Sequence, residues 1–135
     1  MRRIDFRGQR LDTKEWTYGC LLITELKGNL EPLHYFICPI KNEGMHRVMP
    51  ETVGQFTGLH DKNGKEIYEG DIVEYEDYSN GLYLFKEQPK AKGVIKINDL
   101  LSEIYLKGLG TFEGNKVEVI GNIYENPELL EVSHG

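Results

Sequence analysis

The stretch Gly54–Tyr75 constrains the fold more than any other part of the sequence, because two turn signals divide it into short apolar segments. The first signal is Asn63-Gly64, a pair that is typical of tight β-hairpin turns. The second is Glu69-Gly70-Asp71, where we expect Gly70 to adopt a positive φ and Asp71 to cap the turn with its side chain. The stretch therefore predicts a strand, a turn, a short strand, a turn and a strand.

The rest of the chain continues this pattern of short strands separated by turn residues. Residues 3–7 alternate polar and apolar side chains, which is typical of a half-buried strand, and residues 16–24 are its expected hairpin partner. Residues 41–50 are expected to form a loop that exposes His46. Gly121 lies inside the last apolar run and predicts a β-bulge or close packing there. Further strands are expected at residues 33–37, 52–56, 72–75, 82–85, 93–97, 103–106 and 116–124.

One helical turn is predicted, near the C-terminal end. Asn126-Pro127-Glu128 is typical of a helix start, with Asn126 as N-cap and Pro127 at the first helical position. We expect this turn to end at Glu131. Because no longer helical pattern occurs, we predict a mainly β fold, a small barrel or roll with an N-terminal β-hairpin region. We predict an N-terminal β subdomain at residues 1–50 and a barrel subdomain at residues 51–135.

Composition narrows the classes of protein that the chain can belong to. No apolar run is long enough for a transmembrane helix, and no apolar segment of a secretory signal follows the basic start. The two cysteines, Cys20 and Cys38, fit no zinc or redox motif and lie in apolar runs. These features predict a cytoplasmic protein with buried, reduced thiols, and a disulfide is the less favoured alternative.

Charge is unevenly distributed along the sequence. Residues 1–50 carry eight Lys/Arg against six Asp/Glu, whereas residues 51–135 carry eight against sixteen. Non-specific nucleic-acid binding needs clustered cations, so we do not expect it from the acidic part. The first ten residues are the exception. They form either a nucleic-acid-binding arm or, as we favour, an edge strand whose charges discourage sheet association. The four arginines concerned are Arg2, Arg3, Arg7 and Arg10.

No arrangement of residues predicts a catalytic, metal or cofactor site. Asp61 begins a segment like a calcium-binding loop, but the fifth and twelfth positions hold Lys65 and Ile72, where such a loop needs oxygen ligands. No nucleophile motif or phosphate-binding loop occurs, and the four histidines lack ligand spacing. A run of acids leaves a metal-dependent hydrolase open as an alternative, although a solvated strand face is favoured. These acids are Glu66, Glu69, Asp71, Glu74, Glu76 and Asp77.

Tyrosines are numerous in the second half of the sequence. Aromatic faces on small barrels can stack on single-stranded nucleic acid, but that role needs a basic groove beside them. Core and protein-interface roles suit the apolar body and polar tip of tyrosine better in this acidic region. The residues that we predict as a candidate partner surface are Tyr68, Glu69, Asp71, Tyr75 and Tyr124.

Three segments of the sequence are family signatures: Ile4–Arg7, Gln55–Val73 and Val119–Leu130. Together they resemble the YopX family of phage and prophage proteins, and the resemblance includes both ends and the middle of the chain. After Phe-Arg the family commonly has Ala-Trp-Asp, whereas this chain has Gly8-Gln9-Arg10. The role of that family tryptophan is therefore open, with Trp16 nearby.

The resemblance implies a mostly β protein with an SH3-like barrel in its C-terminal part. It also implies a phage-encoded cytoplasmic accessory protein, with no catalytic residues to transfer. We therefore expect a non-enzymatic protein-binding or assembly module that binds a phage or host protein or forms a homo-oligomer, and we do not expect a membrane or nucleic-acid partner. A nucleic-acid-binding protein using the basic arm and a metal-dependent hydrolase using the acidic run remain the alternatives.

Overall fold

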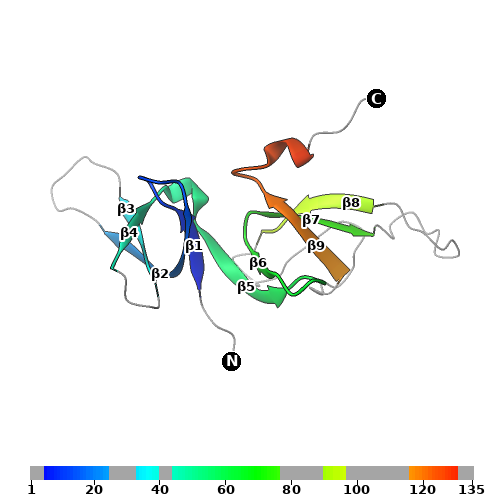
Figure 1. The fold of residues 1–135 in the computed structure, drawn as a ribbon, viewed down its shortest axis with the longest axis horizontal. Coiled ribbons are helices and arrows are strands. Elements are labelled where there is room, and N and C mark those ends of the chain that lie inside the picture. The colour runs from blue at the N-terminus through cyan, green and yellow to red at the C-terminus, as the bar shows by residue number, and fades with distance from the viewer. Residues whose placement is uncertain (1–4, 25–32, 40–43, 77–89, 97–115, 131–135) are drawn as a thin grey trace, which may run out of the picture. The chain divides into compact units, whose positions relative to one another are not determined.

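Short antiparallel strands and 3-10 turns make up the regular structure of residues 5–24, 33–39, 44–76, 90–96 and 116–130, the parts of the chain that the computed structural model describes (Figure 1). These parts contain no α-helix and no closed barrel, so the predicted mainly β class is confirmed at this level. The chain divides into two compact units, Met1–Phe56 and Thr57–Gly135. The predicted subdomain boundary after residue 50 stays a prediction.

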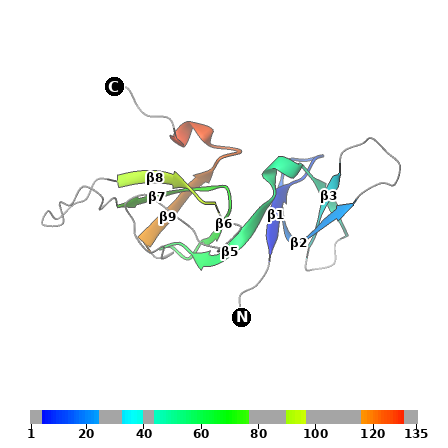
Figure 2. The same cartoon turned by 180° about the vertical axis from the view of Figure 1, so that it is seen from behind.

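The first unit is built on a β-meander. It contains β1 (Phe6–Gln9), β2 (Trp16–Thr24), β3 (His34–Cys38) and β4 (His46–Val48), and consecutive strands pair antiparallel. Figure 2 shows β1, β2 and β3 neighbouring one another from behind. A 3-10 turn, η1 (Pro50–Thr52), leads into β5 (Gly54–His60), whose first residues pair with β1.

The β-meander curls until the far edge of β4 meets the end of β1. Val48 forms a bridge with Arg10, Leu11 N–H donates to the Arg47 carbonyl (2.9 Å), and Met49 N–H donates to the Gln9 carbonyl (2.9 Å). The strands can approach because Gly8 lies against Val48, so that a Cβ on Gly8 would be 3.0 Å from the Val48 Cβ. The curl buries Val48 and, on β3, Ile37.

The N-terminal hairpin is confirmed, with β2 at the predicted residues 16–24. The prediction of an edge strand is wrong, since β1 lies between β2 and β5 in the sheet. The loop predicted at residues 41–50 is also wrong at residues 46–48. That segment forms β4, because both its sides find backbone partners, and His46 is half-buried. No periodicity in so short a segment indicates this pairing.

The second unit begins within β5. The end of β5 and β6 (Glu66–Tyr68) are neighbouring strands, and the sheet order is β4-β3-β2-β1-β5-β6. A separate three-stranded sheet has the order β8-β7-β9, with β7 (Asp71–Glu76) between β8 (Lys90–Val94) and β9 (Val117–Asn122). The hairpin and the strands predicted around residues 72–75 and 116–124 are thus confirmed. β8 begins before the predicted strand 93–97.

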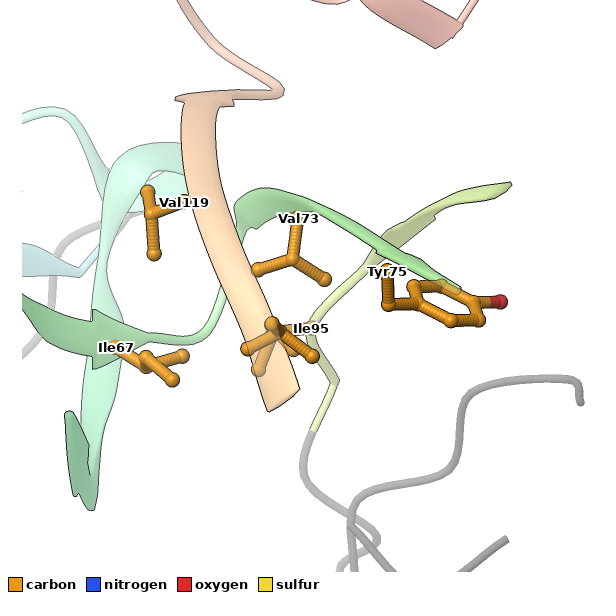
Figure 3. Close-up of a cluster of buried hydrophobic side chains, with 6 residues drawn as sticks. Ile67, Val73, Tyr75, Ile95 and Val119 are labelled. Carbon is orange, nitrogen blue, oxygen red and sulfur yellow. The ribbon is translucent and has the colours of Figure 1, made fainter. Parts of the chain in front are cut away.

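The core of this unit collects side chains from β6, β7, β9 and the residue after β8 (Figure 3). Alternation along β7 places Val73 and Tyr75 on the same face, which packs into this core. Burial of each such large apolar side chain contributes roughly 1.5–3 kcal/mol to stability. Leu59 and Ala91 pack at its margin. The cluster comprises Ile67, Val73, Tyr75, Ile95, Val117 and Val119.

The bulge predicted at Gly121 is confirmed, together with close packing. Ile72 pairs with Gly121 and Val73 with Val119, so Ile120 has no residue opposite it on β7. A Cβ on Gly121 would be 2.6 Å from Asn126 Oδ1, so a larger residue there would have to displace the Asn126 side chain.

The predicted C-terminal helical turn is confirmed as η3 (Pro127–Leu130), a 3-10 turn. The predicted side-chain cap is different. Asn126 Oδ1 accepts a hydrogen bond from Asn122 N–H (3.2 Å), and the Asn126 carbonyl accepts from Leu129 N–H (3.0 Å). Asn126 therefore holds the turn to the end of β9 with its side chain.

Some predictions lie outside the described residues. They include the strands at 82–85 and 103–106 and the residues Arg2, Arg3, Asp77 and Glu131. No helix in the described parts is long and apolar enough to cross a membrane.

The contact between Gly8 and Val48 yields a test of the curled β-meander. We expect Gly8→Ala to lower the free energy of unfolding by about 1–3 kcal/mol, because its new methyl group overpacks against Val48. In a Val48→Ala background the same change should have a much smaller effect. Urea denaturation of the two single variants and the double variant measures this coupling. Equal effects of Gly8→Ala in both backgrounds would contradict the close approach.

Candidate functional site

The five residues of the predicted partner surface gather at two turns and on β7, and most of their side chains are interior. Tyr68, Asp71 and Tyr75 are 2%, 1% and 5% exposed. Glu69 and Tyr124 are half-buried. A partner surface made of all five stays a prediction, but only Glu69 and Tyr124 offer a substantial part of their side chains to solvent.

The Glu69-Gly70-Asp71 turn fixes β6, β7 and their neighbours to one another. Asp71 Oδ2 accepts a hydrogen bond from Tyr68 N–H (2.8 Å), and Gly70 has a φ of 89°, as the sequence predicted. Gly70 N–H donates to the Ile95 carbonyl, and Ile95 N–H donates to the Asp71 carbonyl, both at 2.9 Å. The Gly70 carbonyl accepts from Ile123 N–H (2.9 Å). The turn thereby anchors the ends of β8 and β9.

Tyr124 stands against this turn. A Cβ on Gly70 would be 2.9 Å from Tyr124 Cε2. The fold thus brings together Tyr124 and the turn, which the sequence separates by more than fifty residues. The contact gives a steric reason for glycine at position 70, in addition to the positive φ of that residue. The ring of Tyr124 packs on the turn.

The Asp61 carboxylate binds backbone N–H groups through both of its oxygens. Its Oδ1 accepts hydrogen bonds from the N–H groups of Asn63 and Lys65, both at 2.9 Å. Its Oδ2 accepts from Val119 N–H on β9, also at 2.9 Å. The side chain is buried. One carboxylate therefore both shapes the loop between β5 and β6 and fastens it to β9.

The environment of Asp61 favours its ionised form. Burial raises the pKa of this carboxyl, but hydrogen bonds from Val119, Lys65 and Asn63 outweigh burial, and the charge of Lys65 adds to them. The pKa of Asp61 consequently lies below its ordinary value of 3.8. Sequence reasoning missed this role because the partner from β9 is distant in the chain.

The acidic run does not converge on a common point in the described structure. Asp71 caps its turn, Glu66 accepts a hydrogen bond from the Tyr68 hydroxyl (3.1 Å), and Glu74 pairs with Lys90 (3.6 Å). Within the described ranges, no three His, Cys, Asp or Glu side chains are placed to hold a metal ion together.

Two arginines of the basic arm are engaged within the chain. The Arg7 guanidinium carbon lies 4.6 Å from the centroid of the Trp16 ring, and the Arg7 side chain is buried. Arg10 donates two hydrogen bonds to the Asp12 carboxylate, Nε to Oδ1 (3.0 Å) and Nη2 to Oδ2 (2.8 Å). Trp16 therefore has a structural role in this chain, covering Arg7.

A hollow of about 340 Å³ lies beside β4 in the first unit. Leu11 and Met45 are 48% and 56% exposed there. The sequence contained no recognisable signal for this hollow, because the turn after β1 and the segment before β4 are joined by backbone pairing between residues far apart in the chain. The residues that line it are Arg10, Leu11, Asp12, Met45, His46 and Arg47.

Asp61 yields a pH-dependent prediction. Because its folded-state pKa is lowered, its contribution to stability is complete above the unfolded-state pKa and disappears as the pH falls through the folded-state pKa. We expect Asp61→Asn to lower the free energy of unfolding by about 2 kcal/mol at pH 7, since the amide cannot accept all three hydrogen bonds. The loss should be smaller at pH 3, as measured by urea denaturation.

The matched control for this prediction is Asp12→Asn, which removes an exposed carboxylate paired with Arg10 and should change stability little at either pH. If Asp61→Asn lowered the free energy of unfolding equally at pH 7 and pH 3, the ionisation of Asp61 would not account for its contribution to stability.

Gly70 and Gly64 provide a second matched pair, because their φ values are 89° and 86°. A Cβ on Gly64 meets nothing within 4 Å, whereas one on Gly70 meets Tyr124. We expect Gly64→Ala to cost about 1–2 kcal/mol from backbone strain alone, and Gly70→Ala about 1 kcal/mol more. Thermal and urea denaturation check this difference. It should vanish in a Tyr124→Ala background, and its persistence there would refute the role of the ring.

Comparison with known proteins provides a structural relative and a family. No curated protein matches the chain. The crystal structure of protein EF1440 from Enterococcus faecalis is 24% identical in sequence, with a TM-score of 0.47, and the alignment covers 97% of this chain and 100% of that chain. The YopX protein family matches residues 5–131, which confirms the resemblance seen in the sequence. The chain belongs to the YopX protein family.

Proposed function

We propose that this chain is a non-enzymatic assembly module of phage or prophage origin that acts in the cytoplasm of the host cell by binding a second copy of itself. The observation that carries the proposal is the hollow beside β4, which exposes two apolar side chains next to cationic ones. The SH3-like barrel that the family resemblance implies for the second unit remains part of this proposal, as a scaffold for contacts between proteins.

The hollow has the chemistry of a small protein-docking site. Leu11 and Met45 present apolar surface, and methionine adapts its shape to different neighbours. Arg47 is exposed and His46 half-buried at the same place. Protein interfaces commonly combine an apolar centre with arginine and a polar rim. The hollow therefore suits an apolar side chain that is flanked by a carboxylate.

The C-terminal turn of a second copy supplies such a group. On η3, Glu128 is exposed and Leu130 is 39% exposed, and Glu125 just before η3 is exposed as well. We place Leu130 of one copy against Leu11 and Met45 of the next, with Glu128 opposite Arg47. The charge distribution agrees with this choice, because residues 1–50 have a net positive charge and residues 51–135 a net negative one.

The proposed contact joins two different surfaces, so it is heterologous. Repeated contacts of this kind form a ring when the rotation closes and a filament when it does not. That geometry is why we infer assembly rather than a simple symmetric dimer. The intrachain contacts of Arg7 and Arg10 favour a protein partner over nucleic acid, because a phosphate would have to compete with Trp16 and Asp12 for these groups.

A charge exchange tests the proposal. We expect wild-type protein at low salt to show concentration-dependent association in sedimentation velocity, weakening as salt screens the charges. Arg47→Glu and Glu128→Arg should each weaken the association at least about tenfold, because each places like charges together. The double variant should restore it, since the pair is then reversed in every copy.

Lys96→Glu and Glu51→Arg serve as matched controls, because both residues are exposed, lie outside the hollow and η3, and undergo the same charge reversals. They should leave the association unchanged. A wild-type chain that stays monomeric at every concentration would refute the proposal. So would a double variant that associates no better than either single variant.

A further inference from the structure

The two cysteines of the chain lie directly opposite each other in the first unit. In the register of β2 and β3, Cys20 pairs with Cys38, Leu21 with Ile37 and Leu22 with Phe36. Opposed residues of an antiparallel pair point to the same face, so both thiols are on one side of the sheet. Cys20 is exposed and Cys38 half-buried, and neither is in a disulfide. The prediction of buried thiols is therefore wrong for Cys20.

The register brings the cysteine backbones within reach of a disulfide. Opposed Cα atoms in antiparallel sheets are about 4.5 or 5.5 Å apart, depending on the hydrogen-bonding pattern. Disulfides join Cα atoms that are roughly 4.4–6.8 Å apart, so either pattern is compatible. A Cβ on Gly19 would overlap the carbonyl oxygen of Cys38, which shows that the two strands approach closely beside this pair.

The pair is also held in register on both sides. β2 lies between β1 and β3, and β3 lies between β2 and β4. The neighbouring Ile37 is fully buried, so a one-residue slip would expose a core side chain. The two thiols consequently stay opposite each other throughout the folded state.

We propose that Cys20 and Cys38 are a redox modification site that closes reversibly into a cross-strand disulfide when the chain meets a peroxide. The exposed Cys20 thiolate attacks one peroxide oxygen, forming a sulfenic acid and releasing water after protonation. The Cys38 thiolate then attacks the Cys20 sulfur and displaces the second oxygen as water. Two thiols are oxidised by two electrons, and the peroxide is reduced to two water molecules.

The same geometry makes the bond easy to reduce. Cβ atoms of opposed residues are about 4.5–5.5 Å apart, whereas a disulfide needs about 3.5–4.5 Å. Closure must therefore draw two strands together that are already paired, and strained, exposed disulfides are the more readily reduced ones. A dithiol reductant reopens the bond by thiol–disulfide exchange, becoming oxidised itself. The inference does not rest on the proposed assembly, because neither cysteine lines the hollow.

Mass spectrometry of the intact, full-length chain tests the site. Dilute native protein treated with hydrogen peroxide should lose about 2 Da as a monomer, lose both titratable thiols, and regain them with dithiothreitol. A disulfide-linked peptide containing both cysteines should appear after proteolysis. The oxidised chain should unfold at a temperature several degrees higher, because the bond closes the loop between the two cysteines.

Three variants separate paired chemistry from ordinary cysteine oxidation. Cys20→Ser and Cys38→Ser should gain oxygen or form linked dimers, with no increase in unfolding temperature. Cys38→Ser combined with Phe36→Cys moves the second thiol from opposite Cys20 to opposite Leu22, so closure should be much slower. Wild-type protein that gains oxygen without losing 2 Da, or that forms linked dimers in place of an internal bond, would overturn the proposal.

Discussion

The carboxylate of Asp61 is the interaction on which the second unit most depends. Three backbone N–H groups donate to it, two from the loop between β5 and β6 and one from Val119 on β9. A buried anion is stable only when such donors replace water, and here the donors belong to segments far apart in sequence. The Asp61 carboxylate thereby holds the hairpin of β5 and β6 to the three-stranded sheet, so that Ile67 on β6 and Val119 on β9 lie in one core.

Close backbone approach is the second physical theme of the chain. Gly8 admits Val48, Gly70 admits the ring of Tyr124, and Gly121 admits Asn126. At each place a Cβ would lie 3.0 Å or less from its neighbour, so packing favours glycine there, and at Gly70 the positive φ favours glycine as well. The candidate residues Glu69 and Asp71 belong to one of these packed turns, and Tyr124 packs on it. Their clustering in the sequence resembles a functional site, whereas in the fold their contacts stabilise the turn.

The hollow beside β4 and the opposed cysteines, by contrast, lie in the first unit. A hollow with Leu11, Met45 and Arg47 is suited to a protein segment that carries an apolar side chain and a carboxylate. The opposed thiols of Cys20 and Cys38 are a separate feature of β2 and β3. Both arise from strand pairing between segments that the sequence places well apart, and neither contains a motif of catalysis. We propose the hollow as a surface for association and the cysteine pair as a site for reversible oxidation.

The sequence by itself determined the β class, the first hairpin, the turns at Asn63-Gly64 and Glu69-Gly70-Asp71, the bulge at Gly121, and membership of the YopX family. These features depend on local backbone preferences, alternation and contiguous motifs, which neighbouring residues specify. Only the tertiary structure decided that β1 is interior, that residues 46–48 form β4, that Asp61 binds β9, and that Tyr68 and Tyr75 are buried. Each of these depends on a partner remote in the chain, and short strands carry too few residues to reveal such a partner.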